Sequence, residues 1–205
     1  MAAKTSKDKS KALDRRAVVR MLLADRGELL VIAGLGAPAW DATDAGDHPL
    51  NFPLWGGMGG AAAIGLGLAL AQPDCRVLVL TGDGELLMGM GSLATIGVQH
   101  SRNLSVVVLD NERYGETGMQ ASHTAFGVDL AAAAKACSFV STKMLTTIDQ
   151  VGRLRVDIHR ADGPLFAQVK VAADKLPLVL PPRDGAHLKD RFREALFGKD
   201  AHFQR

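Results

Sequence analysis

Short apolar runs rich in β-branched residues alternate along this chain with longer stretches that have apolar residues at helical spacing. Unbroken apolar runs of this length are typical of strands buried on both faces of a parallel sheet. Strands are predicted over residues 29–33, 76–81, 104–109, 139–141 and 165–171. Helices are predicted over residues 12–23, 58–71, 86–99, 131–136, 148–159 and 187–196. The alternation predicts an α/β fold, a doubly wound and mostly parallel sheet with helices on both faces.

The remaining segments divide the chain into a core domain and two flanking pieces. Residues 1–11 are lysine-rich and are predicted to be disordered, and residues 12–175 form the predicted domain. Within the domain, residues 37–54 carry three prolines and several acidic residues and are expected to be a loop. Residues 176–205 form a C-terminal extension that starts with a proline-bearing link and ends in a short helix.

Composition narrows the classes of function. At 205 residues with 47% hydrophobic positions, the chain is long enough for one substantial core. A formal net charge of +2 is too small to indicate binding to nucleic acid or to a membrane surface. The longest apolar stretch, residues 56–71, is interrupted by glycines and is too short for a membrane span. No apolar signal-peptide core occurs in residues 1–20, and Cys75 and Cys137 fit neither a disulfide framework nor a zinc site, so a cytoplasmic protein is expected.

The most informative polar residues stand just past the ends of two strands. Asp83, in Gly82-Asp83-Gly84, follows the strand 76–81, and Asn111 follows the strand 104–109. The helix between these strands makes them parallel neighbours, so both side chains are expected at the carboxyl edge of the sheet, where ligands of such folds bind. A carboxylate and an amide oxygen suit Mg²⁺, and Gly84 allows the backbone to approach a phosphate closely.

Each of these residues also has a purely structural interpretation. Asp83 can cap a helix, Asn111 can form an Asx turn, and Met58 can be an ordinary core methionine. Asp110, next to Asn111, is expected to be a structural polar group rather than a metal ligand. The pairing of Asp83 with Asn111 at matching positions of adjacent strands favours metal binding.

Three segments in order resemble the signature of enzymes that use thiamine diphosphate (ThDP). Gly82-Asp83-Gly84 followed by Asp110-Asn111 resembles the motif that binds the diphosphate, and residues 55–59 resemble the segment that holds thiamine in its bent conformation. More narrowly, residues 88–97 and 110–118 are similar to β subunits of sulfopyruvate decarboxylase and to the matching half of phosphonopyruvate decarboxylase. The resemblance covers roughly residues 29–172.

The resemblance implies ThDP and Mg²⁺ as cofactors and assigns residues to them. The implied metal ligands are Asp83, Asn111 and the backbone carbonyl of Arg113. The implied cofactor contacts are Gly56, Gly57, Met58, Gly82, Asp83, Gly84, Glu85, Asn111, Tyr114, Gly115, Glu116 and Thr117. Glu116 and His123 are candidate catalytic residues, since a carboxylate or an imidazole near the thiazolium could move a proton. Alternatively, Glu116 is a glutamate at the start of a surface helix, and His123 is an ordinary surface histidine.

The family also needs a glutamate that activates the cofactor. This glutamate belongs to a separate pyrimidine-binding domain. Nothing in this sequence resembles that domain, and Glu28, the only glutamate before residue 83, lies at a strand entrance in the wrong context. The resemblance therefore implies a hetero-oligomer in which a pyrimidine-binding subunit completes the site. The implied reaction is decarboxylation of a small 2-oxoacid to CO₂ and an aldehyde. A lone chain is expected to self-associate through the surface left uncovered.

Two other functions fit parts of the pattern. The first is the β subunit of a 2-oxoacid:ferredoxin oxidoreductase, which shares the run Tyr-Gly-x-Thr-Gly, although two isolated cysteines cannot hold an iron–sulfur cluster. The second is a non-catalytic protein of the ThDP fold that binds a partner, against which the intact Asp83 and Asn111 argue. Arg102 and Arg113 could each attract an anionic substrate, and the sequence does not say which subunit holds the substrate anion.

Overall fold

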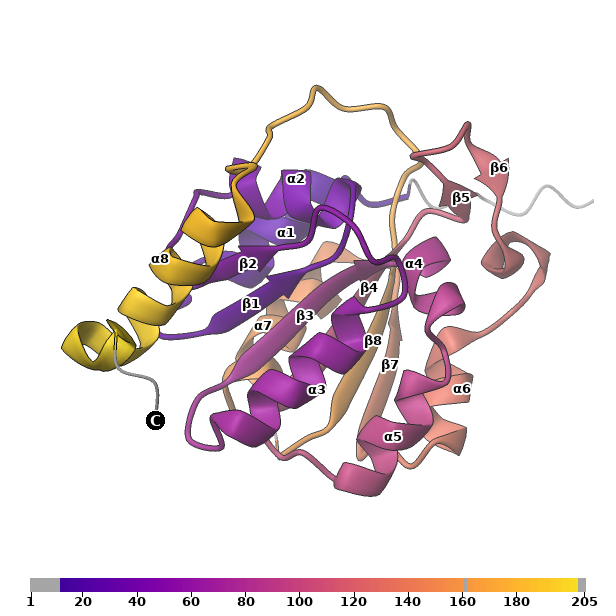
Figure 1. Cartoon of the computed structure of the whole chain (residues 1–205). Helices are drawn as coiled ribbons and strands as arrows, with labels where there is room; N and C mark the ends of the chain where they lie inside the picture. The colour runs from indigo at the N-terminus through magenta and orange to yellow at the C-terminus, as the bar shows by residue number, and fades with distance from the viewer. Residues whose placement is uncertain (1–11, 161, 203–205) are drawn as a thin grey trace, which may run out of the picture.

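The computed structural model describes residues 12–160 and 162–202, and a six-stranded parallel sheet forms its centre (Figure 1). The strand order is β2-β1-β3-β4-β8-β7, and every neighbouring pair is parallel. The strands of the sheet are β1 (Leu30–Ala33), β2 (Asn51–Pro53), β3 (Val77–Gly82), β4 (Leu104–Asp110), β7 (Ser141–Leu145) and β8 (Leu165–Lys170). The two strands expected to precede the metal ligands, β3 and β4, are parallel neighbours, which confirms that prediction.

Helices cover both faces of the sheet, because alternate residues of each buried strand point to opposite sides. Leu78 and Leu80 of β3 belong to the core under α1 and α7, whereas Val77 and Val79 belong to the core under α3, α5 and α6. The α-helices are α1 (Arg15–Leu23), α2 (Ala37–Asp44), α3 (Ala61–Ala71), α4 (Asp83–Met88), α5 (Ser92–Gln99), α6 (Leu130–Ala136), α7 (Ile148–Arg160) and α8 (Gly185–Phe197). The doubly wound α/β fold expected from the alternation is confirmed.

The segment 37–54 is not the loop that its prolines suggested. It contains α2 and the edge strand β2. Pro38 lies in the first turn of α2, where a missing backbone N–H costs nothing, and Pro53 is the last residue of β2. The prolines therefore mark the ends of short elements rather than a continuous loop.

The single helix predicted over residues 86–99 is two helices, α4 and α5, separated by Gly89, Met90 and Gly91. The break has a packing reason. A Cβ atom on Gly89 would lie 1.9 Å from the backbone oxygen of Gly59, so the chain passes too close to the loop before α3 to continue as a regular helix with side chains.

Two further differences concern strands. Residues 113–121 form a small antiparallel hairpin, β5 (Arg113–Tyr114) with β6 (Gln120–Ala121), followed by a 3₁₀ helix, η1 (His123–Phe126). The hydrophobic pattern predicts no strand over these residues. The strand predicted over 139–141 lies later, as β7, because this edge strand is half-buried and polar and lacks a continuous apolar run.

After β8 the chain crosses the carboxyl ends of the strands as an extended segment, residues 172–184, called the strap below (Figure 1). The Trp55 side chain donates from Nε1 to the Pro182 carbonyl at 2.7 Å, and Arg16 donates to the Pro177 carbonyl. Helix α8 then returns along β2, with Phe192 packed edge-on against Phe52. A second 3₁₀ helix, η2 (Gly198–His202), follows.

The predicted disorder of residues 1–11 lies outside the described residues. Among the helices that the structure describes, none combines the length and hydrophobicity needed to span a membrane.

Candidate functional site

A cavity of about 540 Å³ opens at the carboxyl edge of the sheet, between the strap and the N-terminal half of α4. Most of the predicted site residues line it: Met58, Gly82, Asp83, Gly84, Glu85, Asn111, Arg113, Tyr114, Gly115, Glu116 and Thr117. Its other walls are largely apolar and come from α2 and the strap, with Trp40, Leu176 and Leu178. Gly56 and Gly57 are exposed and lie outside this lining, and so does His123.

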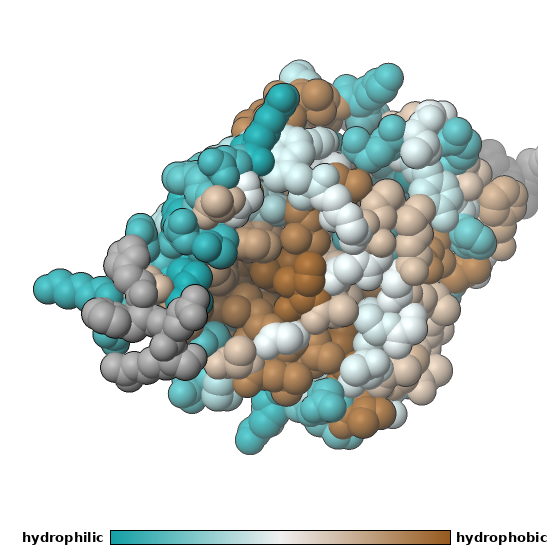
Figure 2. Space-filling view, viewed as in Figure 1, coloured by the Kyte–Doolittle hydropathy of each residue, from teal (hydrophilic) through white to brown (hydrophobic). Residues whose placement is uncertain are grey.

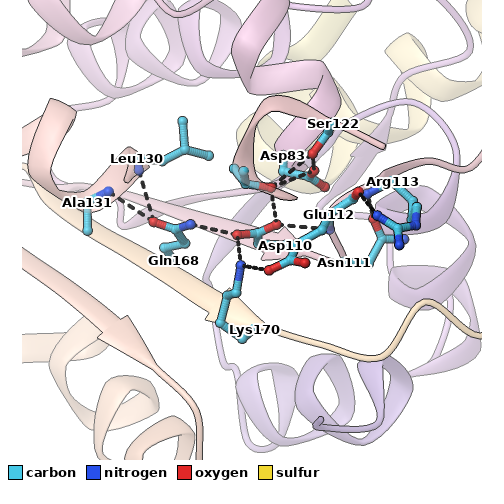
Figure 3. Close-up of polar contacts among 11 residues, drawn as sticks. Asp83, Asp110, Asn111, Glu112, Arg113, Ser122, Leu130, Ala131, Gln168 and Lys170 are labelled. Carbon is cyan, nitrogen blue, oxygen red and sulfur yellow. Dashed lines mark hydrogen bonds and ion pairs between the residues drawn. The ribbon is translucent and has the colours of Figure 1, made fainter. Parts of the chain in front are cut away.

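Asp83 is the first residue of α4, and its side chain is almost fully buried. Two hydroxyls lie near one of its oxygens, Oδ2: Ser122 donates to it (Figure 3), and the Thr124 oxygen lies 3.3 Å from it. Burial raises the pKa of the Asp83 carboxyl, and the nearby Asp110 charge adds to this shift. A bound cation would stabilise the ionised form of a carboxylate in such a position.

Asp110 is fully buried and accepts hydrogen bonds at both oxygens (Figure 3). Oδ1 accepts from the Thr124 hydroxyl at 2.8 Å and from the Glu112 backbone N–H at 3.0 Å. Oδ2 accepts from Gln168 Nε2 at 2.6 Å and from Lys170 Nζ at 2.8 Å. With both oxygens engaged by protein donors, Asp110 is a structural group that holds the ends of β4 and β8 together.

Lys170 also pairs with Glu112 at 2.6 Å. Burial alone would lower the pKa of the Lys170 ammonium, but the hydrogen bonds and charges of Asp110 and Glu112 outweigh it and raise the pKa. The ammonium therefore stays charged, which keeps the buried Asp110 carboxylate compensated.

Asn111 forms an Asx turn, since its Oδ1 accepts from the Arg113 backbone N–H at 2.9 Å. Ser122 N–H donates to the Glu112 carbonyl, so Glu112 and Ser122 are a bonded pair of the hairpin. Bonded and non-bonded pairs alternate along an antiparallel ladder, so the next pair, Arg113 with Ala121, is non-bonded, and the Arg113 carbonyl points away from β6.

The oxygen atoms that Asp83, Asn111 and Arg113 offer are of the kind that Mg²⁺ requires. Asp83 offers a carboxylate whose Oδ1 accepts no hydrogen bond from another residue of the described chain, Asn111 offers an amide oxygen, and Arg113 offers a carbonyl. All three residues line the same cavity. Mg²⁺ favours a few protein oxygens together with phosphate oxygens and water, and the set contains no nitrogen or sulfur ligand. The residues present therefore fit a Mg²⁺–diphosphate group.

Close backbone packing fixes the two loops that would contact the cofactor. Gly59, in the loop that carries Met58, has φ +91°, and a Cβ atom there would lie 2.9 Å from the Gly89 backbone nitrogen. Gly84 faces the Tyr114 ring, and a Cβ atom there would come within 2.6 Å of it. These contacts hold the Met58 loop against the end of α4 and the hairpin against its start.

Glu85 lies on the edge of the cavity, but its carboxyl group is directed into the protein. It is almost fully buried and accepts from the Thr81 hydroxyl at 2.8 Å, and a Cβ atom on Gly34 would overlap it. Burial raises the pKa of this carboxyl group. The Glu85 side chain therefore links β1 and β3 to α4, which leaves its backbone as the part that faces the cavity.

The two candidate catalytic residues lie in different places. Glu116 is exposed in the β5–β6 turn and lines the cavity, with its carboxylate against Gly36 at the start of α2. His123 is exposed on η1, outside the cavity lining, with Nδ1 3.3 Å from the Tyr114 hydroxyl. A proton-transfer role for Glu116 stays a prediction, and the position of His123 gives such a role no support.

Four residues of the network around Asp110 were not singled out from the sequence. Ser122 and Thr124 sit in an irregular polar stretch that carries no local signal. Gln168 and Lys170 did carry one, because they are polar residues within an otherwise apolar buried strand and such groups need partners. Gln168 Oε1 in turn accepts from the backbone N–H groups of Leu130 and Ala131 at the start of α6.

Comparison with known proteins agrees with this geometry. Residues 37–169 match the family model described as the C-terminal TPP-binding domain of thiamine pyrophosphate enzymes. The chain belongs to the thiamine pyrophosphate enzymes. Thiamine pyrophosphate is the same compound as ThDP, so the matched domain is the one that the Gly82-Asp83-Gly84 motif indicated.

The curated proteins to which the chain is similar include two subunits and one whole decarboxylase. The chain is 34% identical over 186 residues to the β subunit of sulfopyruvate decarboxylase from Methanothermobacter thermautotrophicus, covering 91% of this chain and 97% of the relative. It is 31% identical to the corresponding β subunit from Methanocaldococcus jannaschii, covering 87% and 95%. It is 34% identical to the phosphonopyruvate decarboxylase of Streptomyces viridochromogenes, covering 87% of this chain but 45% of that protein.

Solved structures show the same fold in longer chains. The ThDP-dependent 4-hydroxybenzoylformate decarboxylase of Rhodococcus jostii superposes with a TM-score of 0.66 at 17% identity, covering 86% of this chain and 36% of that one. The benzoylformate decarboxylase of Polynucleobacter necessarius gives the same TM-score at 19% identity, covering 87% and 36%. This chain thus spans about a third of the length of those enzymes.

Proposed function

We propose that this chain is the diphosphate- and Mg²⁺-binding subunit of a ThDP-dependent decarboxylase that acts on a 2-oxoacid bearing a sulfonate or phosphonate at C3. The observation that carries the proposal is that Asp83, Asn111 and Arg113 line one cavity, in a chain of the thiamine pyrophosphate family. The relatives that it matches over nearly their whole length are β subunits of sulfopyruvate decarboxylase. The match to phosphonopyruvate decarboxylase supports the same class of substrate.

Each part of the cavity has a role in this reaction. Asp83, Asn111 and the Arg113 carbonyl would hold Mg²⁺, and the backbone at Gly84 and Glu85 would contact the diphosphate. Met58 would support the thiamine, while the apolar wall of α2 and the strap would exclude water from the reacting carbon. The bound cofactor supplies the electron sink that decarboxylation of a 2-oxoacid needs.

The proposal includes a second polypeptide that supplies the activating glutamate. The surface of α3 supports this part. Its sequence is apolar all round, and such helices are normally buried on every side. Here Ile64 and Leu70 are exposed, and Figure 2 shows a continuous hydrophobic surface on the face that carries α3. A surface of this kind marks an interface.

Co-expression with a candidate pyrimidine-binding subunit tests the reaction. We expect decarboxylation of sulfopyruvate or phosphonopyruvate that requires both chains, ThDP and Mg²⁺. Asp83→Ala should abolish it, whereas Asp149→Ala, an exposed aspartate in the first turn of α7, should not. ThDP binding that does not depend on Asp83, or turnover by this chain alone, would contradict the proposal.

A pair of matched surface variants tests the partner interface. Ile64 on α3 and Val156 on α7 are each 41% exposed, but they lie on opposite faces of the sheet. Ile64→Glu should weaken association with the second subunit at least tenfold, because it buries an unpaired charge, while Val156→Glu should have little effect. Equal affinity of both variants for the second subunit, measured by calorimetry, would exclude the α3 face as the interface.

A further inference from the structure

Three cations line the cavity: Arg15, Arg113 and Lys175. Arg15 is committed to the protein, since its guanidinium is buried and pairs with the fully buried Asp41. Arg113 donates from Nη1 to the Glu112 carbonyl at 2.9 Å and has no carboxylate partner among the described residues. Lys175, on the strap, makes no ion pair within residues 12–160 and 162–202. Two cations of the lining are therefore available to a ligand.

Both cations lie on segments that leave neighbouring strands at the carboxyl edge of the sheet, and both line the same cavity. Asp110 and Lys170 are paired residues at the ends of β4 and β8, and the Val171 N–H donates to the Asp110 carbonyl at 3.0 Å. Arg113 lies just after β4 and Lys175 lies on the strap after β8, so both segments leave the sheet at its carboxyl edge. In Figure 1 the start of the strap and β5 both lie above the carboxyl ends of the strands.

The acidic residues of the lining do not neutralise this pair. Asp83 and Glu85 are buried and bonded to hydroxyls of the protein, and Glu116 lies against Gly36 at the start of α2. Asp174 is exposed and forms no ion pair with its neighbour Lys175. The wall beyond the pair is apolar, with Leu176 and Leu178 of the strap. A low-polarity wall strengthens the attraction between these cations and a ligand anion.

We propose that Arg113 and Lys175 bind the C3 sulfonate or phosphonate of the substrate and so determine its specificity. The inference rests on the proposed function and names the residues that recognise the second anion. The planar guanidinium can donate two parallel hydrogen bonds to oxygens of such a group, and the ammonium adds a mobile point charge. A substrate without that group, such as pyruvate, does not depend on the pair for binding.

The test uses the assembled complex with ThDP and Mg²⁺. The variants are Lys175→Met, Arg113→Met and the double variant, each of which keeps the length of the aliphatic stem. Lys189→Met and Arg153→Met, on the outer surfaces of α8 and α7, are the matched controls. One readout is kcat/KM for sulfopyruvate, phosphonopyruvate and pyruvate. The second is binding of the unreactive analogues 3-sulfolactate, 3-phosphonolactate and lactate, followed by tryptophan fluorescence, since Trp40 lies in the cavity wall and Trp55 packs against it.

Each single variant should lower kcat/KM for sulfopyruvate or phosphonopyruvate about ten- to hundredfold relative to that for pyruvate, as expected for loss of a hydrogen bond to a charged group. The acid whose kcat/KM falls more, sulfopyruvate or phosphonopyruvate, carries the C3 group of the natural substrate. An equal loss for lactate and 3-sulfolactate would overturn the assignment, because the pair would then bind the common carboxylate. Unchanged sulfopyruvate kinetics would overturn it while leaving the proposed function intact. Binding of 3-sulfolactate that depends on Lys175, without turnover of any acid, would support the inference and reject the proposed reaction.

Discussion

Gly89 and Gly59 touch through their backbones, at the point where the end of α4 meets the loop that carries Met58. A Cβ atom on Gly89 would lie 1.9 Å from the Gly59 carbonyl oxygen and 2.7 Å from its carbonyl carbon. Backbone atoms cannot move aside as the end of a side chain can. The position of Met58 relative to Asp83 therefore depends on the absence of a side chain at residue 89.

The first prediction follows from this contact. Gly89→Ala should lower the free energy of unfolding by about 1–3 kcal/mol, because the new methyl group forces the two backbones apart. It should also weaken ThDP binding through displacement of Met58. Gly91→Ala is the control, since Gly91 has φ −58° and nothing within 4 Å of its Cβ position. Chemical denaturation measures the stability, and equal stabilities of the two variants would contradict the steric argument.

A second prediction concerns the difference between two aspartates. Asp110→Asn should lower the unfolding free energy by about 3–5 kcal/mol, because Lys170 loses a buried partner and the new amide group faces other donors. Asp157→Asn, which removes a more exposed ion pair with Lys143, should cost less than about 1 kcal/mol. A small loss at Asp110 would show that the network around it contributes little.

Asp83 should behave in the opposite way. Burial raises its folded-state pKa above the unfolded value, so ionisation of this carboxyl group at neutral pH costs folding free energy. Asp83→Asn removes that cost and keeps an acceptor for Ser122. The cofactor-free variant should therefore unfold at a temperature no lower than the wild type, while losing metal-dependent ThDP binding. Calorimetry of the two proteins without ThDP checks this, and a lower unfolding temperature of the variant would count against it.

A fourth prediction concerns pH. Burial lowers the pKa of His159, with smaller contributions from Arg155 and Arg76, and the ring Nε2 is buried without a hydrogen-bond partner in the described chain. The folded state thus binds a proton at this ring less readily than the unfolded state, whose pKa is about 6.5. Stability should fall as the pH drops through this value. His159→Gln should reduce the loss, as measured by urea denaturation at pH 7.5 and pH 5.5, and an unchanged loss would refute the assignment.

The sequence predicted the parts of the molecule that depend on local patterns. Buried strands such as β3 and β4 are continuous apolar runs, and the candidate metal ligands were chosen by their position at the ends of those strands. The strap and the hairpin could not be predicted, because their conformations depend on contacts with residues far along the chain, such as Trp55 with Pro182. The break between α4 and α5 likewise comes from the distant Gly59.

The candidate site shows the same limit. Asp83 and Asn111 could be paired from the sequence because adjacent parallel strands bring their ends together. Lys175 could not be assigned to the site from the sequence, since nothing in the local sequence indicates that the strap crosses the cavity. Asp110 was correctly interpreted as structural, but its donors Thr124, Gln168 and Lys170 come from segments that only the fold brings together.

The strap also has a consequence for the order in which the protein is built. The sheet is complete once β8 has inserted between β4 and β7, at Lys170. The far wall of the cavity, with Lys175, Leu176 and Leu178, comes from residues made after that point. During synthesis from the N-terminus, the segment that completes the sheet is therefore made before the segment that encloses the pocket.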